Sequence, residues 1–485
     1  MHIKKIFFFL NILTFIGFIG VITFFDSNLF NFVASSYAIF YYVLIFISLA
    51  LAGRVFQAEV LFLHLILFSY YGFRIFFLSV SEHFSFKVQY YDFMRYENLI
   101  QADFENAILF LIIAVLVIIL FQIFLITKNK KLDTFNSPYS LKLENLLLYI
   151  SLALIIFKGV YAFVAFDSLI NKAWPDSTFK IIIQYFIEYT SFLVIFVMYT
   201  LFKNFFTRQN NFLPILILIV YVFALIPGGG KGILLGPLVF LFFIGLWFGI
   251  SKISKKFLII LPLVIIFTGF MATGQHFILN YLSDRGGVSS SHVTQSLSLY
   301  KKLNYDSILY PISTLSKRFG GLDWIAMSQS TFYRDRIGSE VSLVKTLRRI
   351  ADRFLPKSYK DQSLIPNGRI IAEGIRMEPK STRENYGEYF TLLGYLGFYG
   401  FYAPLFLWPL LYIIYISRRL NNPYIKIGIS LTIVMNYFMA GDAPSAIKFT
   451  LLSIIVFQFW VFFARFILSI QRWLNSQFSR HKISH

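Results

Sequence analysis

The chain has 485 residues, of which 57% are hydrophobic and only 14% are charged. Soluble domains carry about 25% charged residues, so this composition excludes an ordinary soluble protein. The formal net charge is +20, and the chain has no cysteine, which excludes disulfides, thiolate nucleophiles and cysteine-bound zinc. We expect an all-α polytopic membrane protein, because in lipid every backbone polar group must be satisfied within its own helix.

Apolar runs near 20 residues long predict about twelve transmembrane helices. The first run follows Lys4 and Lys5 and has no small-residue cleavage site, so we expect a retained helix rather than a signal peptide. The expected spans are 6–25, 30–52, 59–80, 106–127, 145–166, 179–202, 212–227, 233–250, 257–280, 389–416, 424–441 and 446–470.

The connections between these spans alternate in charge. One set is consistently basic, so by the positive-inside rule we expect it to be cytoplasmic, together with both termini. Basic residues placed in this way indicate orientation in a membrane rather than a nucleic-acid partner. The chain then divides into helices 1–9 (residues 1–280), a large outward loop (281–388), and helices 10–12 with a basic cytoplasmic tail (389–485).

We call the outward segment 281–388 the polar island. Loops much longer than about 15 residues are usually functional or disordered. The island carries 17 Lys and Arg against 11 Asp and Glu, and the positive-inside rule does not explain a basic surplus in a long translocated loop. An anionic partner would explain it: a phospholipid headgroup, a lipid pyrophosphate or an acidic glycan. Trp324, Tyr333 and Phe354 indicate that the island packs against something, so we expect it to help form the site.

Residues 343–355 predict a basic amphipathic helix inside the island. Leu343, Leu347, Ile350 and Phe354 recur at three- and four-residue spacing, and the basic side chains lie elsewhere. Such a helix can lie in the plane of the lipid headgroups. Packing on the island's own fold is the alternative.

Charges inside membrane spans are costly and tend to be functional, and three such residues are candidates here. They are Arg74, Lys158 and Glu188, each in the outer part of its span. Lys158 and Glu188 could pair with each other. Alternatively, Arg74 and Lys158 line a polar cavity that opens outward and binds an anion.

The sequence Pro227-Gly228-Gly229-Gly230-Lys231-Gly232 joins the seventh and eighth spans. Glycines let a backbone approach a ligand closely, and Lys231 adds a point charge suited to phosphate. The spacing excludes a Walker A motif. A tight helical hairpin is the alternative.

The island ends Arg383-Glu384-Asn385-Tyr386-Gly387-Glu388, shortly before Gly394-x-x-Gly397. Small residues at such spacing are typical of close helix packing. Glu384 and Glu388 are four residues apart and would share one face of a helix.

Together, these features resemble the Wzy-type oligosaccharide repeat-unit polymerases (O-antigen, capsule or exopolysaccharide) and the wider O-antigen polymerase/ligase superfamily. The element Gly230-Lys231-Gly232 is similar to the family's frequent Gly-Ser-Arg-Gly, with Lys for Arg. The loop end is similar to the ligases' His-Asn…Glu-x-Gly-x-x-Gly signature, with Arg383 and Asn385 near where a ligase has its His. The absence of that His favours the polymerase branch.

The resemblance implies a glycosyltransferase that moves a glycan from undecaprenyl pyrophosphate onto another lipid-linked repeat unit. Cations would then hold the pyrophosphate, and a carboxylate would orient or deprotonate the attacking hydroxyl. We expect neither a cofactor nor a metal, because the activated lipid supplies the driving force and the histidines are isolated. The candidate pyrophosphate- and glycan-binding residues are Lys231, Arg285, Arg369, Arg376, Arg74 and Lys158, and the candidate catalytic residues are Glu388, Glu384 and Arg383, with His276 as a further candidate base.

Three alternatives stay open. The first is an O-antigen ligase. The second is a polyprenyl-phosphate-dependent transferase of single sugars, for which Asp103, Glu105 and Asp26 would be the acidic residues. The third is a lipid-linked oligosaccharide flippase, against which the large island and the lack of two similar halves argue. A chain-length regulator and a flippase are candidate partners.

Overall fold

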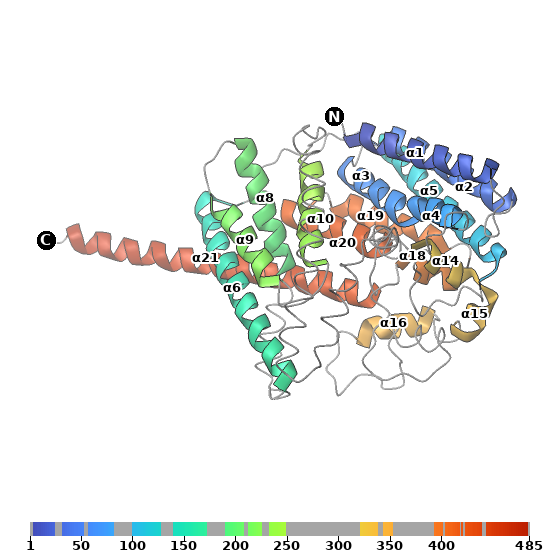
Figure 1. The fold of residues 1–485 in the computed structure, drawn as a ribbon. Coiled ribbons are helices and arrows are strands. Elements are labelled where there is room, and N and C mark those ends of the chain that lie inside the picture. Colours follow the sequence, from blue (N-terminus) through green and yellow to red (C-terminus); the bar gives the residue numbers. More distant parts are fainter. Residues whose placement is uncertain are drawn as a thin grey trace, which may run out of the picture.

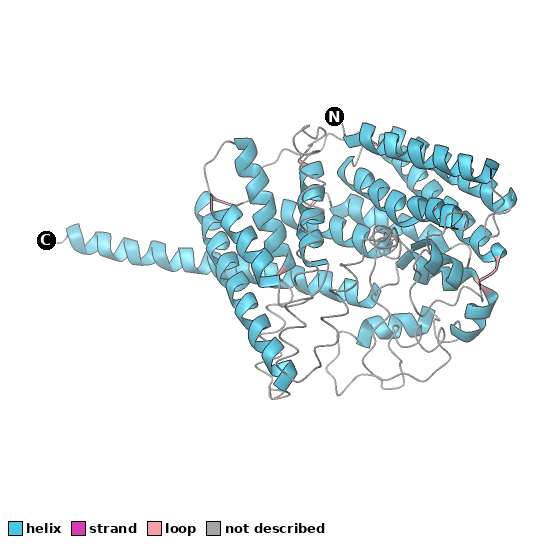
Figure 2. Ribbon diagram, viewed as in Figure 1, coloured by secondary structure: helices cyan, strands magenta, loops and turns pink. Residues whose placement is uncertain are grey.

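A computed structural model of the chain describes residues 3–24, 32–52, 57–81, 99–127, 139–171, 190–207, 212–225, 232–248, 321–337, 343–352, 392–400, 403–417, 419–420, 422–438 and 443–483. Within these ranges every regular element is a helix, as the composition predicts (Figure 2). The elements, in chain order, are α1 (Ile3–Phe24), α2 (Phe32–Leu51), α3 (Gln57–Ile66), the π-helix η1 (Leu67–Gly72), α4 (Phe73–Ser81), α5 (Gln101–Thr127), α6 (Leu141–Asn171), α8 (Ser191–Thr207), α9 (Leu213–Leu225), α10 (Gly232–Trp247), α14 (Gly321–Gln329), α15 (Thr331–Ile337), α16 (Leu343–Asp352), α18 (Leu392–Leu396), the 3₁₀-helices η6 (Gly397–Tyr399) and η7 (Ala403–Phe406), α19 (Leu407–Ser417), α20 (Pro423–Phe438) and α21 (Ala443–Ile483).

Six helical segments among the described residues are long and apolar enough to cross a membrane. A span needs about 20 residues, and the segments are Lys5–Phe24, Phe32–Leu51, Ala58–Ser79, Gln101–Leu125, Leu141–Val160 and Thr450–Ser476. The helices α8, α9, α10, α19 and α20 coincide with predicted spans but are shorter than that length. The predicted ninth span, 257–280, lies outside the described residues. A membrane protein is therefore supported, and twelve spans stay a prediction.

The predicted tenth span, 389–416, is not one continuous helix. The helix α18 passes into η6, and Gly400 then has φ 113°, a left-handed conformation that favours glycine because it has no Cβ. The N–H of Gly400 donates to the carbonyl of Gly397 at 3.2 Å, and η7 begins three residues further on. The apolar composition continues across this break, so hydropathy alone could not locate it.

Two groups of helices are joined by the C-terminal part of the chain (Figure 1). In the first group α1 packs on α2 and α4, and α2 packs on α5. In the second group α6, α8 and α9 pack on one another. The helix α20 contacts α3 and α18 as well as α8, so it connects the two groups.

The start of α20 shows how local sequence sets a helix boundary. The side-chain oxygen of Asn422 accepts the backbone N–H groups of Tyr424 at 3.0 Å and Ile425 at 3.3 Å. These are donors that the first turn of a helix cannot satisfy internally. Pro423 occupies the first helical position, where its missing N–H is not needed.

Candidate functional site

The helix α14 belongs to the polar island, yet it lies in the interior of the helical structure. All nine of its residues are buried, including the polar Asp323, Ser328 and Gln329. It packs on α5, on α18 and on η1. Trp324 was expected to pack against another part of the protein, and it and its apolar neighbours bury against α5 and α18.

A buried ion pair ties α14 to the third predicted span. Arg74, on α4, donates from Nε to both carboxylate oxygens of Asp323 at 3.2 and 3.1 Å, and from Nη2 to Oδ2 at 2.5 Å. Both side chains are 1% exposed. A forked guanidinium–carboxylate contact fixes orientation as well as distance. Removing either partner of such a pair would leave a buried charge without compensation and cost about 3–5 kcal/mol.

The π-helix η1 directly precedes Arg74 in the chain. A π-turn interrupts the regular i→i+4 ladder, and such interruptions are frequent at functional sites. Two tyrosines of α2 bind backbone carbonyls of this segment. The hydroxyl of Tyr41 donates to the Leu67 carbonyl at 3.1 Å, and that of Tyr42 donates to the Gly72 carbonyl at 2.6 Å. The backbone that carries Arg74 is therefore held by α2.

Glycines at two positions let α14 approach its neighbours. A Cβ on Gly321 would lie 2.8 Å from the ring of Tyr71, so α14 begins against η1. A Cβ on Gly397 would overlap the hydroxyl of Ser328 and lie 2.9 Å from Nε2 of Gln329. The Gln329 amide also donates to the Gly397 carbonyl at 3.1 Å. The Gly394-x-x-Gly397 pattern was expected to mark close packing, and at Gly397 this is confirmed.

The C-terminal end of α14 is held by polar contacts as well. Asp103 accepts the backbone N–H of Ile100 at 3.0 Å, which caps α5, and it also accepts the hydroxyl of Ser330. Arg334, on α15, donates to the Gly397 carbonyl at 3.3 Å. Because of these contacts, the next island helix starts at a fixed place beside α5 and η6.

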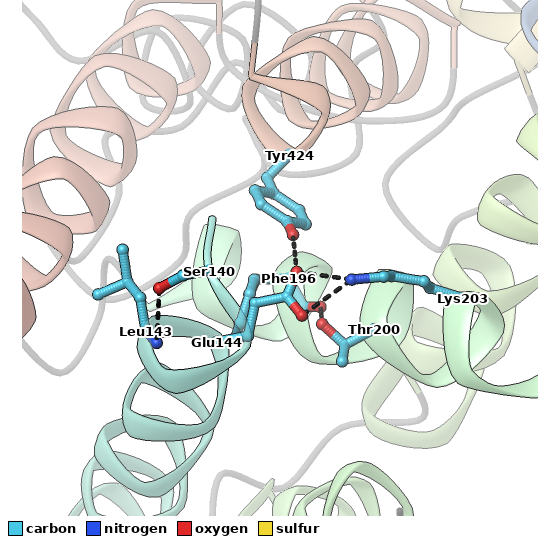
Figure 3. A network of polar contacts seen from close by, with 7 residues as sticks. All are labelled: Ser140, Leu143, Glu144, Phe196, Thr200, Lys203 and Tyr424. Atoms are coloured by element: carbon cyan, nitrogen blue, oxygen red, sulfur yellow. Dashed lines mark hydrogen bonds and ion pairs between the residues drawn. The ribbon is translucent and has the colours of Figure 1, made fainter. Parts of the chain in front are cut away.

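A second polar network, shown in Figure 3, joins the ends of α6, α8 and α20. Lys203 Nζ donates to both oxygens of Glu144 at 2.9 Å, and the Tyr424 hydroxyl lies 3.5 Å from Oε1 of the same carboxylate. The Glu144 side chain is 4% exposed and that of Lys203 is 20% exposed. We call these three residues the Glu144 network. They were all expected at the basic, cytoplasmic ends of their spans.

A tyrosine next to the Glu144 network extends it toward α21. Asn422 donates its amide to the Tyr139 hydroxyl at 2.7 Å, and the rings of Tyr139 and Tyr424 stack with centroids 5.5 Å apart. The guanidinium of Arg465, on α21, lies 6.0 Å from the centre of the Tyr139 ring. Burial raises the pKa of Tyr139, so its hydroxyl stays protonated at neutral pH.

Two of the predicted anion-binding residues fall in the described part of the chain. Arg74 is ion-paired with Asp323, whereas Lys158 lies with Nζ 6.0 Å from the ring centre of Tyr221, on α9. The helices α4 and α6 that carry them belong to different groups (Figure 1). The structure does not bring these two cations together, and the anion-binding role of each stays a prediction.

The other predicted site residues lie outside the described residues, as does Glu188, the alternative partner of Lys158. Their roles stay predictions. They are Lys231, Arg285, Arg369, Arg376, Arg383, Glu384, Glu388 and His276.

The amphipathic helix predicted at 343–355 is confirmed over α16. It packs on α21, with Arg349 only 6% exposed and Arg348 and Val344 exposed. Arg349 was assigned to the polar face of this helix, yet its side chain is buried.

Several buried ionisable residues were missed by the sequence reasoning. Asp323 is a single acidic residue within an otherwise apolar stretch, and that isolation was the available signal. Glu59 and His64 are also buried, in α3, at 3% and 0% exposure. Both lie within the third predicted span, where any ionisable residue is a functional candidate.

Comparison of the chain with protein-family models, with curated proteins and with solved structures finds no match. The interpretation of the site therefore depends on its own residues and geometry. Those residues place an island helix, held by charge and close packing, where the third, fourth and tenth predicted spans meet.

Proposed function

We propose that this protein polymerises oligosaccharide repeat units linked to undecaprenyl pyrophosphate, at the outer face of the bacterial cytoplasmic membrane. The observation that carries the proposal is the insertion of α14 into the helical core through the Arg74–Asp323 pair. A site gains precision when its elements are rigid and supported by a second layer of contacts. An island anchored in this way can hold the sugar end of a lipid-linked substrate against the membrane surface.

The reaction would join two lipid-linked substrates. A hydroxyl at the non-reducing end of one repeat unit attacks the anomeric carbon of the other glycan, and the bond from that carbon to the pyrophosphate oxygen breaks. The undecaprenyl pyrophosphate leaves with the bonding electrons, and a carboxylate, for which Glu388 is the first candidate, takes the proton of the hydroxyl. Arg285, Arg369 and Arg376 are the candidates for stabilising the charge on the leaving group.

One observation bears on the single-sugar transferase alternative. That function would use acidic residues near the start of α5, and Asp103 and Glu105 were the candidates there. The Asp103 carboxylate binds the N–H of Ile100 and the hydroxyl of Ser330, so a structural role accounts for it. This observation weighs against Asp103 as the acidic residue of a single-sugar transferase, and Glu105 and Asp26 stay candidates for that role.

The glycan profile of a strain lacking the gene, compared with its parent, tests the proposal. Loss of long chains, with single repeat units still attached to their final acceptor, is the expected result. Intact polymer that accumulates on the lipid carrier would instead identify a ligase, and a repeat unit one sugar short would identify a single-sugar transferase.

Complementation of that strain tests the site. Arg376→Ala or Arg383→Ala should abolish polymer while the protein stays in the membrane, and Arg348→Ala is the matched control because that island arginine is exposed on α16. Normal polymer from both site variants would refute the site assignment. Reporter fusions at residues 340 and 255 should lie outside and inside respectively, and the reverse would overturn the topology.

A further inference from the structure

The C-terminal helix α21 is much longer than a membrane crossing. It has 41 residues, and at 1.5 Å per residue this is about 60 Å, roughly twice the hydrocarbon thickness of a bilayer. About 20 residues counted from Thr450 end near Ser469, so the last turns extend past the crossing. Figure 1 shows this end of α21 projecting beyond α6 and α9.

The projecting end carries an apolar face that the described protein does not cover. Phe466, Ile470, Trp473 and Leu474 recur at three- and four-residue spacing, so they lie on one side of the helix. Each is exposed, with Trp473 at 60%. Asn475 lies about 200° around the helix from Trp473, on the polar side. An apolar stripe of this kind on one side of a helix needs a partner or a lipid surface.

Every charged residue in the same segment is basic. Between residue 465 and the C-terminus the chain has four cations and no acidic residue. The cations are Arg465, Arg472, Arg480 and Lys482. Arg465 contacts Tyr139 beside the Glu144 network, so the remaining three begin where α21 leaves the helix bundle.

We propose that residues 470–483, which continue α21 past the crossing, bind the anionic phospholipid headgroups of the membrane that α21 crosses. The apolar face enters the boundary between headgroups and acyl chains, where tryptophan is favoured. The basic side chains of this segment contact the phosphates of the lipid headgroups. A lipid surface is favoured over a second copy of this helix because pairing two such segments would bring only like charges together. This inference does not depend on the proposed enzymatic function.

The absence of cysteine allows a direct test in the full-length protein. Single substitutions Leu474→Cys and Asn475→Cys place a nitroxide label on the apolar face and on the polar face. The labelled proteins are reconstituted into phosphatidylcholine vesicles with or without phosphatidylglycerol. The measurement is the collision of each label with oxygen, which concentrates in lipid, and with a water-soluble nickel chelate.

With phosphatidylglycerol present, we expect the label at position 474 to favour oxygen and the label at 475 to favour nickel. The triple variant Arg472→Gln/Arg480→Gln/Lys482→Gln should lose this contrast, because each cation near an anionic leaflet strengthens binding about fivefold and three do so about a hundredfold. Arg419→Gln, an exposed arginine on the connection between α19 and α20, is the matched control and should retain it.

Three results would contradict the proposal. Equal nickel access at both positions in the anionic vesicles would show that the helix end stands in water. Spin–spin broadening at position 474, removed by dilution with unlabelled protein, would show that a second copy covers the apolar face. Retention of the contrast in pure phosphatidylcholine would refute the anionic part of the assignment.

Discussion

Asp323→Asn is the substitution that tests most directly how the polar island is held. It keeps the shape of the side chain and removes its charge, so Arg74 would be left with a buried guanidinium and no compensating carboxylate. Breaking a buried ion pair by removing one partner costs about 3–5 kcal/mol. Both side chains are 1% exposed, so solvent cannot replace the lost charge without undocking α14.

Thiol reactivity can measure undocking of α14 in this cysteine-free chain. Ala326 is fully buried on α14, so Ala326→Cys places a single thiol that a membrane-impermeant maleimide reaches only when the helix leaves its site. If Asp323→Asn destabilises the docked state of α14 by about 3–5 kcal/mol, the fraction of molecules in which α14 is undocked rises by two to four powers of ten. The labelling rate of Ala326→Cys should rise accordingly.

The double variant Arg74→Met/Asp323→Asn provides the internal comparison. It removes both charges, so the labelling rate should fall back from that of Asp323→Asn alone, and the two substitutions should be strongly non-additive. Arg348→Gln, at an exposed island arginine, should leave the rate unchanged. A rate for Asp323→Asn within threefold of the parent, on the order of 0.6 kcal/mol, would refute the view that the pair holds α14.

Three further substitutions probe the packing and the second network. Gly397→Ala should cost about 1–3 kcal/mol because its Cβ overlaps Ser328, and Ser328→Gly should restore part of the loss in the same labelling assay. Lys203→Met should lower the unfolding temperature in detergent by leaving Glu144 buried without its cation, a loss of about 1–3 kcal/mol. Gly400→Ala meets no atom within 4 Å, so its loss of about 1–3 kcal/mol should arise from the positive-φ backbone alone.

Each of these predictions has a matched comparison. Gly20, in α1, also has nothing within 4 Å, but its backbone is helical, so Gly20→Ala should be neutral or slightly stabilising. Equal effects at Gly20 and Gly400 would contradict the strain argument. Tyr424→Phe removes only the 3.5 Å contact to Glu144 and should cost far less than Lys203→Met. No rescue of Gly397→Ala by Ser328→Gly would show that the clash lies elsewhere.

The apolar runs located the described helices well because a membrane crossing imposes both a length and a composition on the sequence. Hydropathy does not detect changes in backbone geometry that leave the composition unchanged, however. The π-turn at Leu67–Gly72 has almost the same residue periodicity as the α-helix around it. The break at Gly400 lies between aromatic and apolar residues that would suit a continuous span. Both irregular segments contact or support α14, so the features that hydropathy did not predict lie at the candidate site.

The burial of α14 could not be predicted from local sequence, because its partners are distant in the chain. Arg74 and Asp323 are 249 positions apart, and each on its own suggested a different role. In the sequence, Arg74 indicated anion binding, and Asp323 counted as one of many charges of an outward loop. Their pairing changes the interpretation of both, since a buried ion pair fixes an arrangement more than it adds stability.

The two polar networks also bear on the order of the membrane crossings. Arg74, Asp103 and Asp323 were all expected on the outer side, and Glu144, Lys203 and Tyr424 on the basic side. Each network joins residues of one expected side only. Six predicted spans separate Asp103 from Asp323, and six separate Glu144 from Tyr424. An odd number in either interval would place the partners at opposite membrane surfaces, so these contacts favour the even numbers that the alternating charges predict.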